Sequence, residues 1–226
     1  MEFQYYLLLI IAGAAGGFMS GLLGVGGGII FIPLLDFIFT MLGVPESEKV
    51  RLILANSLFI IFFTGLLSTH KQYKMGYFYP KAILATALPG IITSIFASWL
   101  IGQGTWYSET LFKSVFLILL VPMVLKLVKG SPKKGIENQI IEDKILNVKW
   151  NYFLPVGAIT GIITSFSGLG GGVVMIPAFV NYLKTGIKKA TAISVGVIPF
   201  FALFQSIFYM INKPQIADNG IAHWGY

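Results

Sequence analysis

Eight apolar stretches, separated by short polar connections, run through this chain and limit what it can fold into. They cover residues 5–23, 27–42, 52–69, 82–101, 111–127, 152–166, 172–183 and 190–211. Several reach the roughly 20 residues that an α-helix needs to cross a bilayer. Charged residues make up 11% of the sequence, against about 25% in soluble domains. The pattern predicts an all-α, multi-pass (polytopic) membrane protein that sits in the lipid bilayer of a cell membrane, the plasma or inner membrane.

Charge and reactive side chains exclude several function classes. The formal net charge of +7 would suggest nucleic-acid binding in a soluble protein, but loop lysines that orient a membrane protein explain it better, so no nucleic-acid partner is expected. The chain has no cysteine, which excludes disulfides and thiolate chemistry. Its apolar stretches hold no pair of carboxylates, histidine cluster or nucleophile–base set. We therefore expect neither an enzyme nor a metal site or cofactor.

Two glycine clusters interrupt the apolar stretches at corresponding places. Residues 20–28 read SGLLGVGGG and precede IIFIP, while residues 165–172 read SFSGLGGG and precede VVMIP. Glycine costs about 1 kcal/mol in a helix relative to alanine, so each cluster should break its helix. A shift of 144 residues aligns 13–33 with 157–177, with nine of 21 positions identical, and 55–57 align with 192–194 further on. The chain is therefore predicted to contain two halves of one design.

The distribution of basic residues predicts how the two halves are oriented. If the chain reverses at each glycine cluster, twelve of the 16 lysines and arginines fall on one side of the membrane and four on the other, whereas a kink within one span gives ten and six. The positive-inside rule then places the twelve in the cytoplasm and the N-terminus outside. The first half has an odd number of segments, which predicts an inverted-topology internal repeat with glycine-broken, discontinuous or re-entrant helices.

The predicted organisation has three parts. Residues 1–129 form the first repeat, with five apolar segments and a break at 24–28; residues 130–149 form a charged cytoplasmic loop; residues 150–226 form the second repeat, with a break at 168–172. The second repeat lacks a counterpart of the hairpin that follows residue 77 in the first. We therefore expect a C-terminally truncated second repeat, with a completing subunit or a homo-oligomer as partner.

The glycine clusters also predict a binding site. A helix start leaves backbone N–H groups unpaired and carries about half a positive charge, which suits a small oxyanion. Two such starts, brought together near the bilayer midplane by an inverted repeat, would form a donor-rich pocket without formal charge. Nearby hydroxyl and amide groups would donate to the same anion. The predicted substrate-binding residues are Ser20, Gly24, Gly26, Gly27, Gly28, Asn56, Ser57, Thr164, Ser165, Ser167, Gly168, Gly170, Gly171, Gly172 and Ser194.

Alternative roles stay open for some residues. Small residues also permit close helix packing in membranes, which any single serine here could serve. Pro33 and Pro177 follow the clusters at equal distance and are expected to kink the short helices, without contact to a ligand. Asp36 has Val180 as its counterpart. It is either a proton relay or a carboxylate near the outer surface.

At these residues the chain resembles the sulfite exporter TauE/SafE family of membrane permeases. The resemblance rests on GFMSGLLGVGGGIIFIP and GIITSFSGLGGGVVMIP, and extends to LANSL at 54–58 and ATAISV at 190–195. It implies transport of small sulfur-containing anions such as sulfite or sulfonates, usually outward and driven by an ion gradient, with a proton or another ion as the coupling ion. The family's motif glycines correspond to Gly24, Gly26, Gly27, Gly28, Gly168, Gly170, Gly171 and Gly172.

Two functions are consistent with these features. The first is a secondary transporter, an exporter, of a small inorganic or organosulfur anion, which works by alternating access as one half moves against the other. The second is a non-transporting membrane scaffold or half-subunit that needs a partner chain, which the shortened second repeat suggests.

Overall fold

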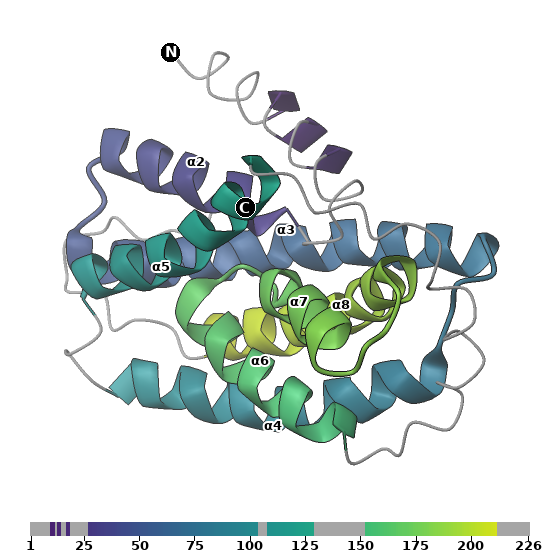
Figure 1. Ribbon diagram of the computed structural model, residues 1–226. Coiled ribbons are helices and arrows are strands. Elements are labelled where there is room, and N and C mark those ends of the chain that lie inside the picture. Colours follow the sequence, from purple (N-terminus) through teal and green to yellow (C-terminus); the bar gives the residue numbers. More distant parts are fainter. Residues whose placement is uncertain are drawn as a thin grey trace.

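The computed structural model describes residues 10–11, 13–14, 17–18, 27–103, 108–128 and 152–211, and these contain helices but no strand. The labelled helices in Figure 1 are α2 (Gly28–Met41), α3 (Glu46–Lys74), α4 (Pro80–Gln103), α5 (Glu109–Val128), α6 (Phe153–Ser167), α7 (Gly172–Asn181) and α8 (Ile187–Ile211). Three apolar segments within them are long enough to cross a bilayer: Lys49–Lys74, Pro80–Ile101 and Ile187–Tyr209. The described part of the chain is therefore an all-helical membrane protein.

Two of the helices are short and begin directly after a glycine. Helices α2 and α7 have 14 and 10 residues, or about 21 and 15 Å of length against a hydrocarbon core of about 30 Å. Their N-caps, Gly27 and Gly171, have φ angles of 80° and 81°, in the left-handed region that favours glycine. Pro33 and Pro177 lie inside the two helices at the same distance from their starts. The second glycine cluster therefore separates α6 from α7, and α2 starts directly after Gly27 of the first.

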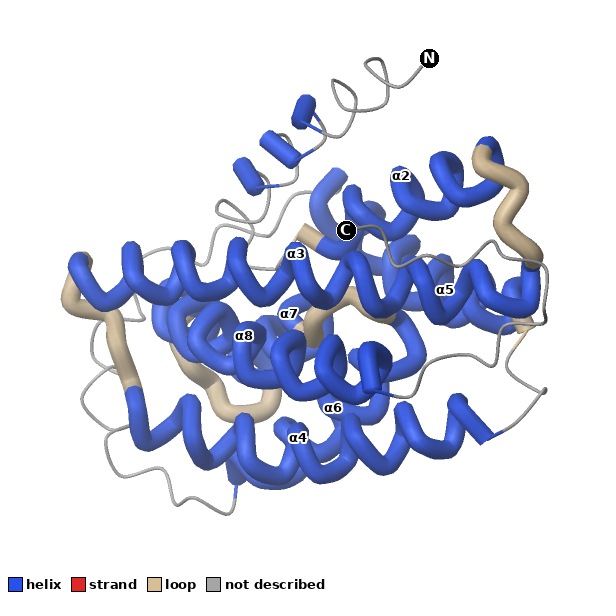
Figure 2. The backbone as a smooth tube through the Cα atoms, turned by 180° about the vertical axis from the view of Figure 1, so that it is seen from behind, coloured by secondary structure: helices blue, strands red, loops and turns tan. Residues whose placement is uncertain are grey.

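Helices α3 and α8 lie side by side and run antiparallel (Figures 1 and 2). Near the end of α3, the Thr69 hydroxyl donates to the Val195 carbonyl oxygen near the start of α8, at 3.0 Å. One turn earlier on α3, a Cβ on Gly65 would lie 2.9 Å from Pro199 Cγ, one turn later on α8. The two helices therefore pair along most of their length in opposite directions.

Helices α4 and α6 are parallel and packed at backbone distance. Thr86, Gly90 and Ser94 on α4 face Gly157, Gly161 and Ser165 on α6, each set spaced by one helical turn. A Cβ on Gly157 would meet the Thr86 carbonyl oxygen, and one on Gly161 would meet that of Gly90. The Ser165 hydroxyl donates to the Ser94 carbonyl oxygen at 2.9 Å. This is the close approach that small residues permit between membrane helices.

Helix α8 lies at the centre of the described bundle. It packs on α3, α4 and α7, and 67% of its apolar segment is buried, against 44% in α3 and in α4. Its buried side includes Ile193, Val197 and Phe201, each fully buried. The outer helix faces carry exposed apolar side chains such as Leu67 and Ile92. An apolar outer surface around an apolar core is what a helical bundle in lipid requires.

The start of α3 lies before the start of the apolar stretch that predicts this helix. The apolar stretch begins at residue 52, but α3 begins at Glu46 and includes Lys49 and Arg51. Pro45 stands directly before the helix, where its fixed φ and missing N–H cost little. Hydropathy marks the part of a helix that lies in lipid, whereas caps mark where the helix ends. The predicted loop at 130–149 and the predicted truncation of the second repeat lie outside the described residues.

Candidate functional site

The second glycine break, residues 168–172, is buried among the helices. Gly168, Gly170 and Gly171 have φ angles of 66°, 74° and 81°, which other residues rarely adopt. A Cβ on Gly168 would also lie 2.7 Å from Leu54 Cδ2, and one on Gly170 would lie 2.9 Å from Ile61 Cγ2. Glycine is therefore required here both by backbone conformation and by space.

The first glycine break contacts the second. A Cβ on Gly28, the first residue of α2, would lie 2.9 Å from Leu169 Cα and 3.1 Å from the Gly168 carbonyl oxygen. The fully buried Ile61 side chain on α3 lies beside both breaks, because its Cδ1 atom is 3.1 Å from the same Cβ position on Gly28 and its Cγ2 atom adjoins Gly170. The start of α2 and the segment that leads into α7 therefore meet at one place inside the bundle.

Neither of the two short helices is capped by a side chain. Gly27 and Gly171 make no side-chain cap hydrogen bond. The first turns close when Ile30 N–H donates to the Gly27 carbonyl oxygen at 3.0 Å and Val174 N–H donates to that of Gly171 at 3.1 Å. The N–H groups before them lie outside the helices' own hydrogen-bond ladders, as at any helix start. Such donors at the buried ends of α2 and α7 can bind an anion.

Most of the predicted hydroxyl and amide groups bond to their own helices. The pairs are Asn56 Nδ2 to Leu52 O (2.8 Å), Ser57 Oγ to Leu54 O (3.1 Å), Thr164 Oγ1 to Thr160 O (2.8 Å) and Ser167 Oγ to Ile163 O (2.8 Å). A hydroxyl has one hydrogen, so these three hydroxyls offer a ligand lone pairs rather than donors in this conformation. Ser57 still lies at the break, since its Oγ would be 3.5 Å from a Cβ on Gly168.

Two fully buried hydroxyls keep their hydrogens for another partner. Within the described ranges, Thr160 Oγ1 on α6 and Ser194 Oγ on α8 have no hydrogen-bond partner. Thr160 borders the break, because its Cγ2 would lie 2.7 Å from a Cβ on Gly171. Ser194 precedes Ile198 by one turn on α8, and Ile198 Cγ2 would lie 3.5 Å from a Cβ on Gly170. These hydroxyls can donate to a ligand held at the break.

The remaining predicted residues are placed as follows. Ser20, Gly24 and Gly26 lie outside the described residues, and Gly172 begins α7 in a buried position. Ser165 takes part in the packing of α4 on α6, because its hydroxyl bonds to α4. Pro33 and Pro177 are exposed, so neither lines the buried break.

Sequence reasoning did not single out Thr160, Ile61 or Ile198. Ile61 and Ile198 flank Gly170 from α3 and α8, and both are fully buried. The alignment of 55–57 with 192–194 contains this signal, because extending it by four positions pairs Ile61 with Ile198. Thr160 has no such signal, since its lack of a partner depends on the packed structure.

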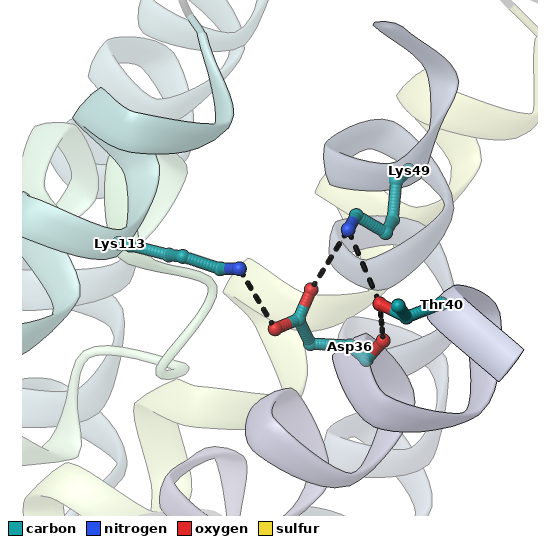
Figure 3. Close-up of polar contacts among 4 residues, drawn as sticks. All are labelled: Asp36, Thr40, Lys49 and Lys113. Carbon is teal, nitrogen blue, oxygen red and sulfur yellow. Dashed lines mark hydrogen bonds and ion pairs between the residues drawn. The ribbon is translucent and has the colours of Figure 1, made fainter. Parts of the chain in front are cut away.

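Asp36 lies in a cluster of charges at the far end of α2 (Figure 3). Its carboxylate is 3.1 Å from Lys113 Nζ on α5 and 3.6 Å from Lys49 Nζ on α3. Lys49 Nζ also donates to Thr40 Oγ1 at 3.2 Å, and Thr40 Oγ1 donates to the Asp36 carbonyl oxygen at 2.7 Å. The end of α2 and the starts of α3 and α5 therefore meet, and the carboxylate is ion-paired.

The fold defines the class of protein, a polytopic helical membrane protein in which the start of α2 meets the glycine break between α6 and α7 inside the bundle. The sequence profile of the family described as "Sulfite exporter TauE/SafE" matches residues 9–225. The chain belongs to this family, and the protein is a membrane transporter.

Named relatives agree with this assignment at the level of the class. A probable membrane transporter protein of Methanocaldococcus jannaschii is 32% identical over 95% of this chain and 77% of its own length. Similar proteins of Haemophilus influenzae and Bacillus subtilis, with the same description, are 29% and 26% identical, over 83% and 92% of this chain and 67% and 79% of their own lengths. No solved structure matches the chain.

Proposed function

We propose that this protein is a secondary transporter that exports a small sulfur-containing oxyanion, such as sulfite or a sulfonate, with a proton or another ion as the coupling ion. The observation that carries the proposal is the contact of Gly28 with Gly168 and Leu169, which joins the start of α2 to the break that leads into α7. The description of the matching family as sulfite exporters supports the choice of anion.

The anion is held by backbone N–H groups rather than by a counter-ion. Gly27, Gly28, Gly171 and Gly172 supply the two helix starts, and Thr160 and Ser194 add hydroxyl donors whose hydrogens are not used elsewhere in the described residues. Partial charges of this kind attract an oxyanion. They also let it leave again, which a transporter needs. Asn56, Ser57, Thr164, Ser167, Gly168 and Gly170 complete the surroundings of the site.

The two halves, residues 1–129 and 150–226, form an inverted-topology repeat joined by the cytoplasmic loop 130–149. Helices α3 and α8 occupy equivalent places, each after a short helix that starts at a glycine. Equivalent helices of an inverted repeat must run in opposite directions, and the Thr69–Val195 hydrogen bond supports this arrangement. A site between two inverted halves can open to either side in turn, which is alternating access.

The proposal is tested by anion efflux from proteoliposomes loaded with sulfite, sulfate or a sulfonate, with and without a proton gradient. Gly27→Leu places a bulky side chain at the start of α2 and is expected to abolish efflux while the protein still inserts. The matched control is Gly43→Leu, because Gly43 also has a positive φ of 69° but has open space around it. Normal efflux in Gly27→Leu would contradict the proposal. Wild-type protein that moves none of these anions but co-purifies with a partner would favour the scaffold function.

A further inference from the structure

A second group of buried polar side chains lies where α4 and α8 pack together. Ser98 on α4 and Gln205, Ser206 and Tyr209 on α8 are each at most 5% exposed. Four of their polar atoms have no hydrogen-bond partner within the described residues: Ser98 Oγ, Gln205 Oε1, Ser206 Oγ and Tyr209 OH. Burying such atoms without partners costs free energy, and alanine or phenylalanine would fill much the same space without that cost. The four groups therefore call for a ligand.

The four groups lie on facing sides of the two helices. Gln205 and Tyr209 are one turn apart on α8, with Ser206 on the same third of the helix surface. Tyr209 lies close enough to Ser98 for the two side chains to interact, but their hydroxyls do not reach hydrogen-bond geometry. Gln205 Nε2 donates to Ser165 Oγ at 2.6 Å, and Ser165 Oγ donates to α4. This bond fixes the amide so that its carbonyl oxygen is the atom left without a partner.

These groups connect the glycine breaks to the far end of α8. Ser165 lies in the last turn of α6, three residues before Gly168. At the other end, Arg51 near the start of α3 acts electrostatically on Tyr209. The order from the break outward is therefore Ser165, Gln205, then Ser98 with Ser206 and Tyr209, and finally Arg51. In the proposed topology this end of α3 faces the outside.

We propose that Ser98, Gln205, Ser206 and Tyr209, here called the α4–α8 polar row, form the outer half of the path along which the transported oxyanion moves. The inference rests on the proposed function and adds residues to it. The three hydroxyls donate to the anion. The acceptor Gln205 Oε1 takes an O–H group, from water that accompanies the anion or from an oxyanion that retains a proton.

The test uses Tyr209→Phe and Ser98→Ala in the full-length protein, with sulfite efflux from proteoliposomes and thermal unfolding in detergent as readouts. Each change removes only a hydroxyl that makes no hydrogen bond within the described part of the chain, so the melting temperature should stay the same or rise. Efflux should fall about ten-fold, because a donor to the moving anion is lost. The matched controls are Tyr182→Phe and Ser114→Ala, both at exposed positions, which should leave efflux unchanged.

The outcomes separate this inference from the proposed function. If the wild-type protein moves sulfite and both variants match it within two-fold, the α4–α8 polar row is not part of the path and the inference is overturned. If efflux and melting temperature fall together, the hydroxyls are structural and the inference is also overturned. If the wild-type protein moves no oxyanion in the panel, the proposed function itself fails, and this inference falls with it.

Discussion

A charged side chain in an apolar helix needs partners, and Asp36 has two that differ in their exposure to solvent, Lys49 and Lys113. The Lys49 side chain is 6% exposed, whereas that of Lys113 is 47% exposed. An ion pair with an exposed lysine contributes little, because water and salt screen it. Removing a carboxylate from beside a buried ammonium costs much more. The stabilising part of this cluster is therefore the contact between α2 and α3.

We predict unequal effects when the cluster is broken. Asp36→Asn should lower the free energy of unfolding by about 2 kcal/mol or more, and Lys113→Gln by less than about 1 kcal/mol. Thermal unfolding in detergent measures both, with Lys81→Gln on the exposed start of α4 as the control. Equal losses would contradict this assignment. Unchanged stability with loss of proton-driven efflux in Asp36→Asn would instead identify a proton relay.

Single residues also show where sequence reasoning stops. The positions of Gly28, Gly168 and Gly171 could be predicted, because glycine spacing and the internal repeat are local signals. The hydrogen bonds of the hydroxyls could not. Ser165 resembles a site residue in sequence, yet its hydroxyl bonds to Ser94 on another helix. Nothing in the sequence points to Thr160 as a site residue, yet its hydroxyl lacks a partner among the residues that the structure describes and it lies at the break. Such differences depend on tertiary packing.

At the scale of helices, the tightest contact joins α4 and α6. No side chain separates the two backbones where Gly157 and Gly161 cross α4, and Thr93 Oγ1 donates to the Ala158 carbonyl oxygen there at 2.8 Å. Glycine in a helix is unfavourable by itself, so packing must offset its cost. The apolar stretches predicted that both helices exist. Their parallel pairing could not be predicted, because small residues do not specify which helix they will meet.

We predict that Gly161→Ala destabilises the fold although alanine favours helix formation. The new methyl group would meet the Gly90 carbonyl oxygen and lie 2.5 Å from Thr93 Oγ1, and overpacking of this kind costs about 1–3 kcal/mol. The melting temperature in detergent should fall. Gly186→Ala, which has open space around it, serves as the control and should have little effect. A melting temperature at or above that of the wild type in Gly161→Ala would contradict the packing described.

At the scale of the whole molecule, side-chain contacts indicate which helix ends lie together. Lys189, at the start of α8, lies over the Tyr79 ring, just before α4, with its Nζ 4.7 Å from the ring centre. The Asp36 cluster gathers the end of α2 with the starts of α3 and α5. The lysine count from the sequence predicts that these two groups of ends lie on opposite sides of the membrane.

We predict the accessibility of four exposed connections. The chain has no cysteine, so single substitutions can be labelled without background. Met75→Cys and Tyr182→Cys should react with a membrane-impermeant maleimide only after cells are opened, and Leu42→Cys and Ser108→Cys should react on intact cells. Reaction of Met75→Cys and Tyr182→Cys from opposite sides would contradict the inverted repeat.

The backbone contact of α4 with α6 has a consequence for motion. Each helix comes from a different half of the sequence, and they touch through Gly157 and Gly161 with no side chain between them to bend or slide. Swinging the first half as one body against the second would pull this junction apart. We therefore expect the contact between α4 and α6 to stay fixed during transport, and the helices that move to come from both halves of the sequence. The boundary between the two repeats in the sequence is then not the boundary between the rigid bodies that move.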